Sequence, residues 1–298
     1  MSSPTDQAAD TLLAALDEID LGIVFLNHNL RTRFINRAFL RIYRLSDRSA
    51  LSDIDFESLM RFVVRKRRVL APAEFNSYIK RRVEEVRAGV EDARDIRMDD
   101  GQAIRVYCKP LPDGGRMLVF TDVTDLVHLA DQLRIQATVD GMTGVFNRRH
   151  FLALAEIEWS RYQRHLRPMS LIMLDIDRFK SINDDFGHYA GDQVIVQVAE
   201  ICQQQKRKFD IIARFGGEEF LILLPETKLE AAQRFAERLR RKVETSAFCV
   251  ASNAIRATIS IGVSEANPSM DTVFDLIKLA DRALYMAKDS GRNRVCAA

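Results

Sequence analysis

A short run at residues 214–220, RFGGEEF, constrains the fold of this chain more than any other stretch. Apolar runs at 211–213 and 220–224 flank it, and two β-type runs joined by a glycine pair predict a hairpin with a tight turn. Glycine tolerates positive φ and leaves room for a bulky ligand beside the backbone. Successive strand side chains point to opposite faces, so Glu218 and Glu219 are expected to do different jobs. An ordinary hairpin with exposed acids is the alternative for this run taken alone.

Composition bounds the class of protein. The chain has 298 residues, enough for two domains that each bury a core, and its net charge of +2 gives no electrostatic case for a nucleic-acid partner. The four cysteines are scattered without a CxxC pair, which is typical of reduced thiols rather than of a disulfide framework or zinc site. No apolar run approaches the ~20 residues that a membrane span needs, so a cytoplasmic protein is the expectation.

The first part of the chain is expected to form a strand pair, then helices, then three antiparallel strands. Asn36 is the expected cap of the helix that follows the strand pair. The expected helices are 6–19, 36–43, 55–68 and 73–88, and the expected strands are 22–26, 31–35, 95–98, 102–109 and 116–121.

This order, with Gly22-Ile23 early and Asp122-Val123-Thr124 at its end, resembles a PAS sensor domain over roughly residues 10–124. The sequence names no ligand for such a domain. No flavin-reactive cysteine motif is visible, and His28 and His128 fall in a predicted turn and a linker, which favours surface or structural roles over haem ligation.

A helical linker is expected over residues 125–139, with Thr124 as its candidate cap. Leu126, Leu129 and Leu133 follow at heptad spacing, which favours pairing with the same helix of a second copy. A single helix packed on its own domain is the alternative.

An apolar run at 170–174 lacks polar alternation and therefore predicts a strand buried on both faces. It leads into Asp175-Ile176-Asp177, so carboxylates are held rigidly near a cleft. Mg²⁺ takes a few hard oxygen ligands and keeps its remaining positions for water and phosphate. Asp175, the carbonyl of Ile176 and Glu218 from the hairpin are the candidate metal ligands. The alternative for Asp175 taken alone is a cap on the next helix.

Four runs together characterise the second part of the chain. They are DGMTGVFNRR at 140–149, DIDRFKSINDDFGHYAGD at 175–192, RFGGEEF at 214–220 and ADRALYMAKDSGRN at 280–293. They resemble, almost position for position, the motifs of the GGDEF family, the diguanylate cyclases, in its GGEEF form. Met142 and Val145 stand where the family has leucine, which are apolar exchanges. The resemblance implies a mostly antiparallel, palm-type sheet with helices around it, so the chain as a whole is expected to be α+β.

The resemblance also implies a substrate site. Asn183 and Asp192 match the positions that hold guanine, and the chemistry agrees, because a carboxylate accepts from guanine N1–H and N2–H₂ together. Ile195 is the expected apolar wall for the base. Lys288 and Arg292 match the triphosphate grip and share a face if the last helix reaches Arg292; two solvated cations are the alternative. The full substrate set is Phe179, Lys180, Asn183, His188, Asp192, Ile195, Lys288 and Arg292.

Arg207 and Asp210 precede the RFGGEEF run at the family's spacing for an RxxD inhibitory product site. A surface salt bridge between the two is the alternative. Arg234 and Arg238, one helical turn apart after the hairpin, are expected to complete such a site across a partner domain, because the planar guanidinium suits phosphate and guanine edges.

The function implied is the condensation of two GTP into cyclic di-GMP with release of two pyrophosphates, regulated by the PAS-like part and by product inhibition. Mg²⁺ is the expected metal, with Mn²⁺ as an alternative; Asp175 and Glu218 would hold it, and Glu219 is a metal ligand or the base for the ribose hydroxyl. A homodimer through the linker and PAS-like part is expected, because the product needs two GTP. One alternative is a non-catalytic module that senses GTP or cyclic di-GMP. The other is a ligand-gated interaction protein that works through its PAS-like part and carries an idle output domain. The expected division is 1–124 sensor, 125–139 linker and 140–298 cyclase.

Overall fold

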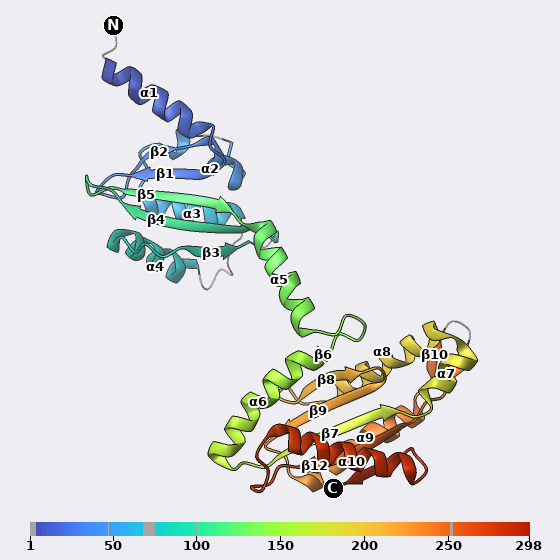
Figure 1. The fold of residues 1–298 in the computed structure, drawn as a ribbon. Helices are drawn as coiled ribbons and strands as arrows, with labels where there is room; N and C mark the ends of the chain where they lie inside the picture. Colours follow the sequence, from blue (N-terminus) through green and yellow to red (C-terminus); the bar gives the residue numbers. More distant parts are fainter. Residues whose placement is uncertain (1–3, 47, 68–74, 99, 251–252) are drawn as a thin grey trace. The chain divides into compact units, whose positions relative to one another are not determined.

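The computed structural model describes residues 4–46, 48–67, 75–98, 100–250 and 253–298, and the chain divides into two compact units, Met1–Asp131 and Gln132–Ala298. Each unit contains a sheet with helices packed against it (Figure 1). Within the described residues, no helix is both long enough and apolar enough to cross a membrane.

The first unit is built on a five-stranded antiparallel sheet in the order β2-β1-β5-β4-β3. Its elements, in chain order, are α1 (Pro4–Asp17), β1 (Gly22–Leu26), β2 (Thr32–Ile35), α2 (Arg37–Ile42), the 3₁₀ turn η1 (Ser49–Leu51), α3 (Phe56–Arg67), α4 (Phe75–Ala88), β3 (Arg94–Arg97), β4 (Ala103–Pro110), β5 (Arg116–Asp122) and α5 (Thr124–Thr138). The predicted order of strands and helices is confirmed. Residue 68, residues 73–74 and Asp99, which fall within expected elements or turns, lie outside the described residues.

One face of this sheet carries the core of the unit. Leu118 of β5, Phe39 of α2, Leu59 of α3 and Ile79 of α4 are each 1% exposed or less and pack in one cluster. Asn36 caps α2 as predicted, because its side-chain oxygen accepts from the Phe39 amide. Burial of such a cluster stabilises the fold by about 1.5–3 kcal/mol for each large side chain.

The start of α5 differs from the prediction. The helix begins at Thr124 itself, so Thr124 is its first residue rather than its cap. The Thr124 hydroxyl accepts from the Ala103 amide of β4, and the Asp122 carboxylate accepts the Thr124 backbone amide at 3.0 Å. The Thr124 hydroxyl therefore connects the helix to strand β4 and does not cap the helix. The Asp122 carboxylate, and not Thr124, accepts from a backbone amide at the start of the helix.

The second unit contains a six-stranded sheet in the order β13-β12-β7-β9-β8-β6, antiparallel except at the two outermost pairs. Its elements are β6 (Phe146–Asn147), α6 (Arg148–His165), β7 (Met169–Ile176), α7 (Phe179–Phe186), α8 (His188–Gln205), β8 (Ile211–Gly216), β9 (Glu219–Pro225), α9 (Leu229–Thr245), the hairpin β10 (Phe248–Val250) and β11 (Asn253–Ile255), β12 (Ile259–Glu265), α10 (Val273–Asp289) and β13 (Val295–Ala297).

Both faces of this sheet are covered, which explains the unbroken apolar run of β7. Ile172 and Leu174 pack in one core with α8 and α9, while Leu171 and Met173 pack in another with α6 and α10. All eight residues of β7 are buried, as predicted for a central strand. A side chain at Gly262 of β12 would collide with the α10 backbone, because its Cβ would lie 2.1 Å from the Ala280 oxygen. The last helix therefore lies directly on the sheet.

One predicted boundary in this unit is wrong, and the structure decides a second that the sequence left open. The run at residues 256–263 predicts a further strand, but β12 begins only at Ile259, so Thr258 precedes it. The last helix ends at Asp289 and does not reach Arg292, since Gly291 follows with a φ of 110°. Lys288 and Arg292 consequently do not share a helix face.

Candidate functional site

The hairpin turn lies one residue later than the glycine pair suggests. Gly216 still belongs to β8 and pairs with Glu219, the first residue of β9, so the turn consists of Gly217 and Glu218. Of the two glycines only Gly217 has a positive φ, at 40°, which is the conformation that favours glycine. Glu218 therefore lies in the turn and is partly buried, and Glu219 begins the strand.

Asp175 lies at the centre of the acidic group. Strand pairing sets it opposite Glu219 of β9 and Ser260 of β12, so the three side chains share one face of the sheet. Asp175 is only 6% exposed, and its carboxylate oxygen lies 2.8 Å from the Lys288 ammonium of α10. It belongs to the strand and caps no helix: the helix that follows, α7, has no side-chain cap.

The electrostatics of Asp175 depend on these neighbours. Burial raises the pKa of its carboxyl to about 6, the Lys288 ammonium opposes that rise, and the charges of Glu218 and Glu219 add to it. The structure therefore brings four of the predicted residues together: two hairpin carboxylates, a buried carboxylate and a lysine that neutralises it.

This donor set fits a divalent cation. Mg²⁺ prefers hard oxygen ligands such as carboxylates. The Asp175 carboxylate already pairs with one cation, the Lys288 ammonium. Within the part of the chain that the structure describes, no group of three or more acidic, histidine or cysteine side chains forms a complete metal cage. A cation here would thus take the remainder of its oxygens from backbone, water or phosphate.

A second cluster lies at the junction of α7 and α8. Asn183 of α7 faces Gly191 of α8 so closely that a Cβ at position 191 would lie 1.9 Å from the Asn183 Oδ1. That oxygen is buried and has no hydrogen-bond partner. An unsatisfied buried acceptor is costly, which makes it a candidate for a ligand donor. Asp192 follows directly at the start of α8 and is partly exposed.

The other predicted substrate residues divide by exposure. Lys180 and His188 are exposed, and Phe179 is partly buried against the core below α7 and α8. Ile195 is 2% exposed within that core, so the structure gives it a packing position, and its role as a wall for the base stays a prediction. Arg292 is exposed on the loop after α10.

The predicted inhibitory pair forms no surface salt bridge. Instead the backbone amide of Arg207 donates to the Asp210 carboxylate at 2.7 Å, which closes the turn between α8 and β8. Asp210 is 6% exposed, and burial raises the pKa of its carboxyl. The Arg207 guanidinium is left for other partners.

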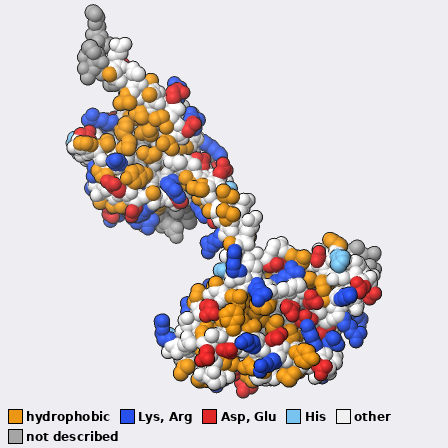
Figure 2. All heavy atoms as spheres, viewed as in Figure 1, with side chains coloured by type: hydrophobic (Ala, Val, Ile, Leu, Met, Phe, Trp, Pro, Cys, Tyr) orange, Lys and Arg blue, Asp and Glu red, His pale blue; other side chains and the backbone are white. Residues whose placement is uncertain are grey.

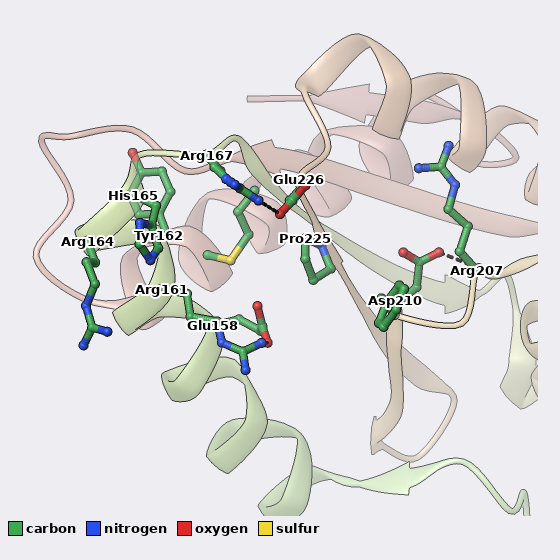
Figure 3. A pocket seen from close by; sticks show the side chains of 12 residues that line it. Glu158, Arg161, Tyr162, Arg164, His165, Arg167, Arg207, Asp210, Pro225 and Glu226 are labelled. Atoms are coloured by element: carbon green, nitrogen blue, oxygen red, sulfur yellow. Dashed lines mark hydrogen bonds and ion pairs between the residues drawn. The ribbon is translucent and has the colours of Figure 1, made fainter.

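Arg207 and Asp210 line a cavity of about 720 Å³ (Figure 3). Three basic side chains of α6, Arg161, Arg164 and His165, line it as well. Basic side chains are thus gathered in this cavity, next to the turn that Asp210 closes.

Arg234 and Arg238 lie on α9, as expected. They line a shallow groove with four neighbours of the same helix, and the Arg238 Nε donates to Gln205 at the end of α8 at 3.1 Å. Arg238 also stacks on the Phe235 ring at 5.0 Å. Both arginines lie exposed on the surface of the same unit as Arg207.

Sequence reasoning missed two polar anchors. Arg214 of β8 pairs with Asp140 at 3.3 Å, and the same Asp140 oxygen accepts from the amide and hydroxyl of Thr143, so the segment before α6 is tied to the hairpin. Asp177 is buried and accepts from the hydroxyls of Thr258 and Ser260. The sequence did contain a signal for the Asp177 contacts: the hydroxyl residues Thr258 and Ser260 lie two positions apart, at the spacing that puts strand side chains on one face.

A mostly antiparallel sheet with carboxylates at the end of its central strand is typical of a palm-type nucleotidyl cyclase domain. A family model described as "Diguanylate cyclase, GGDEF domain" matches residues 137–294, and one described as "PAS fold" matches residues 16–131. The first match spans more than half of the chain, and the chain belongs to the GGDEF diguanylate cyclase family. Both predicted resemblances are thereby confirmed.

Named relatives agree with this assignment. The chain is 39% identical over 209 residues to the diguanylate cyclase DgcM of Escherichia coli strain K12, covering 68% of this chain and 50% of that one. It is 44% identical over 170 residues to the diguanylate cyclase DgcP of Pseudomonas aeruginosa, covering 56% of this chain and 25% of that one. The chain thus spans half or less of the length of these relatives.

A solved structure resembles the second unit. The coiled coil and GGDEF domain of DgcB from Caulobacter crescentus, determined in complex with c-di-GMP, is 32% identical and superposes with a TM-score of 0.56. The match covers 59% of this chain and 93% of that one. The predicted α+β fold class is confirmed by the sheets, the family models and this neighbour.

Proposed function

We propose that this protein is a diguanylate cyclase, which joins two GTP into cyclic di-GMP and releases two pyrophosphates. The observation that carries the proposal is the buried Asp175, set opposite Glu219, electrostatically coupled to Glu218 and paired with Lys288 at 2.8 Å. In a chain of this family, that arrangement supplies both an acidic centre and a cation suited to phosphate.

The reaction needs each ribose 3′-oxygen to attack the α-phosphorus of the other GTP, with pyrophosphate as the leaving group. Asp175, the carbonyl of Ile176 and Glu218 would hold the metal. When bound, Mg²⁺, or Mn²⁺ in its place, would lower the pKa of the ribose hydroxyl and offset charge on the phosphoryl oxygens. Glu219 shares the face of Asp175 and is the candidate acceptor of the hydroxyl proton.

Specificity for guanine is assigned to Asn183 and Asp192. The Asn183 oxygen is buried without a donor, and Asp192 presents a carboxylate one residue after the glycine on which Asn183 packs. Guanine offers the paired donors that a carboxylate accepts, whereas adenine leaves such groups unpaired and is rejected. Lys288 and Arg292 would bind the β- and γ-phosphates, and Phe179, Lys180, His188 and Ile195 complete the proposed substrate-binding set.

The product requires two active sites, so a homodimer is part of the proposal. Leu126, Leu129 and Leu133 of α5 are 53–56% exposed, and no residue of that helix is buried. Hydrophobic side chains lie open on the surface of this linker helix in Figure 2. Exposed leucines at heptad spacing support pairing of the two linkers. Residues 1–124 would act as the sensor, 125–139 as the linker and 140–298 as the cyclase, working in the cytoplasm where GTP is present.

Product inhibition is assigned to the turn of Arg207 and Asp210. The exposed guanidinium and the basic cavity beside it support binding of a dinucleotide phosphate. Arg234 and Arg238 of a partner copy would complete that site.

The alternative is a non-catalytic module that binds GTP or cyclic di-GMP without turnover. Incubation of the purified protein with GTP and Mg²⁺, followed by chromatography, separates the two. A cyclase forms cyclic di-GMP, and Glu218→Gln loses most of that activity, while the exposed Glu200→Gln behaves as the parent. Parent-like turnover in Glu218→Gln would refute the metal assignment, and no product from the parent would favour the sensing module.

A further inference from the structure

The loop between α10 and β13 has an unusual backbone. Gly291, Arg292 and Asn293 follow one another with φ values of 110°, 63° and 46°, so three successive residues are left-handed. That conformation is unfavourable for residues with a side chain, and it persists where surrounding contacts hold it. The loop carries Arg292, the proposed triphosphate ligand.

Asn293 is held by three hydrogen bonds. Its backbone amide donates to the Asp177 carboxylate at 3.0 Å, its Oδ1 accepts from Arg240 of α9 at 2.7 Å, and its Nδ2 donates to Glu244 of the same helix at 2.6 Å. Arg240 is itself fixed, because it also pairs with Glu237 and Glu244, each at 2.9 Å.

The other end of this network reaches the acidic centre. Asp177 is 7% exposed and is fixed by the hydroxyls of Thr258 at 2.7 Å and Ser260 at 2.6 Å. It follows Asp175 by two residues, at the end of β7. Asn293 thus joins the helix α9 to the strand end from which the proposed metal site is built.

Arg292 lies directly before this anchor. Its side chain is exposed, and the hydrogen bonds seen for Arg292 among the described residues are those of its backbone: its amide donates to the Ala287 carbonyl at 3.0 Å, and its carbonyl accepts from Arg294 at 3.1 Å. The place of its side chain relative to Asp175 is therefore set by the backbone, which the amide bond from Arg292 to the Ala287 carbonyl holds on one side and Asn293 holds on the other.

We propose that Asn293 is a positioning residue, which acts through Arg292 to set the triphosphate grip over the acidic centre, with Arg240, Glu244 and Asp177 as its supports. The inference rests on the proposed function, because it needs Arg292 to bind phosphate. It gives the carboxylates and the arginine of α9 a part in placing Arg292, in addition to their contribution to packing.

The test measures binding rather than turnover. The affinity of the full chain for the α,β-methylene analogue of GTP and for GMP is determined by calorimetry, for the parent, Asn293→Ala, Arg292→Ala and the double variant. We expect Asn293→Ala to weaken binding of the triphosphate analogue about 10-fold and to leave GMP affinity unchanged. In the Arg292→Ala background it should have no further effect, since coupled residues are not additive.

A second variant separates backbone from side chain. Asn293→Gly permits the left-handed backbone but removes both side-chain bonds, so it should resemble Asn293→Ala, while the exposed Asn267→Ala should match the parent. Parent-like binding by Asn293→Gly, equal losses for GMP and triphosphate, or additive losses in the double variant would each overturn the inference. A parent that binds the analogue but makes no cyclic di-GMP would refute the proposed function alone.

Discussion

We predict that the Lys288 ammonium neutralises the Asp175 carboxylate as long as no metal is bound, and that it leaves Asp175 when metal and GTP bind. The ammonium of Lys288 lies 2.8 Å from Asp175, and its side chain is 33% exposed while that of Asp175 is 9% exposed. A cation that binds Asp175 must displace this ammonium, which then becomes free for the phosphates. Lys288→Met should therefore have opposite effects on the two ligands, tightening the metal and weakening the nucleotide.

The size of the effect follows from the contact. A hydrogen bond to a charged group contributes about 1.5–3 kcal/mol, and partial exposure of Lys288 argues for the lower end. At pH 8, Lys288→Met should bind Mn²⁺ about 10-fold more tightly in the absence of nucleotide, and the GTP analogue at least about 10-fold more weakly.

The same substitution predicts a change with pH. Lys288 opposes the rise in the pKa of Asp175, so its loss moves that pKa above its value of about 6. Because the carboxylate must lose its proton to bind metal, Mn²⁺ binding should fail at a higher pH in the variant than in the parent as the pH is lowered.

The assay is the free Mn²⁺ signal in electron paramagnetic resonance, titrated with the parent, Lys288→Met and Lys288→Arg. Lys278→Met is the matched control, since Lys278 lies on the same helix and its side chain is 73% exposed. Unchanged or weaker Mn²⁺ binding by Lys288→Met would refute the reasoning, because the ammonium would then not compete for Asp175.

Three further predictions concern the remaining sites. Asp192→Ala should raise the KM for GTP about 10- to 100-fold, with little change in kcat, in initial-rate measurements; an unchanged KM would remove Asp192 from the guanine site. Arg207→Ala should remain active and resist added cyclic di-GMP, whereas inhibition equal to the parent would leave that turn without a regulatory role. Leu129→Asp combined with Leu133→Asp should give a monomer by light scattering and lose turnover, because like charges would meet in the seam; a monomer with full turnover would contradict the dimer.

Much of the fold could be predicted, because the sequence patterns are compatible with few arrangements of helices and strands. The apolar run of β7 leaves no polar face, so it can only lie between two packed layers, and both are present. The turn of the hairpin was misplaced by one residue, since adjacent glycines do not show which of them needs positive φ. The sequence left open whether the last helix reaches Arg292. In the structure α10 ends at Asp289, and Gly291 follows with a positive φ.

The site was less readable where it depends on contacts between distant residues. The motif assigns Asp175 to metal and Lys288 to phosphate, but only the structure shows that the two pair with each other. The bond from Asn293 to Asp177 joins residues 116 positions apart, and no periodicity reports it. The sequence therefore names the reacting groups and leaves out what orients them.

The central claim is that this chain condenses GTP, and the stoichiometry of the reaction tests it most directly. Pyrophosphate and cyclic di-GMP are measured in the same reaction of the full chain with GTP and Mg²⁺, with ATP in parallel. We predict two pyrophosphates for each cyclic di-GMP and no cyclic product from ATP. Phosphate release with GDP or GMP in place of the dinucleotide, or equal turnover of ATP, would contradict the account.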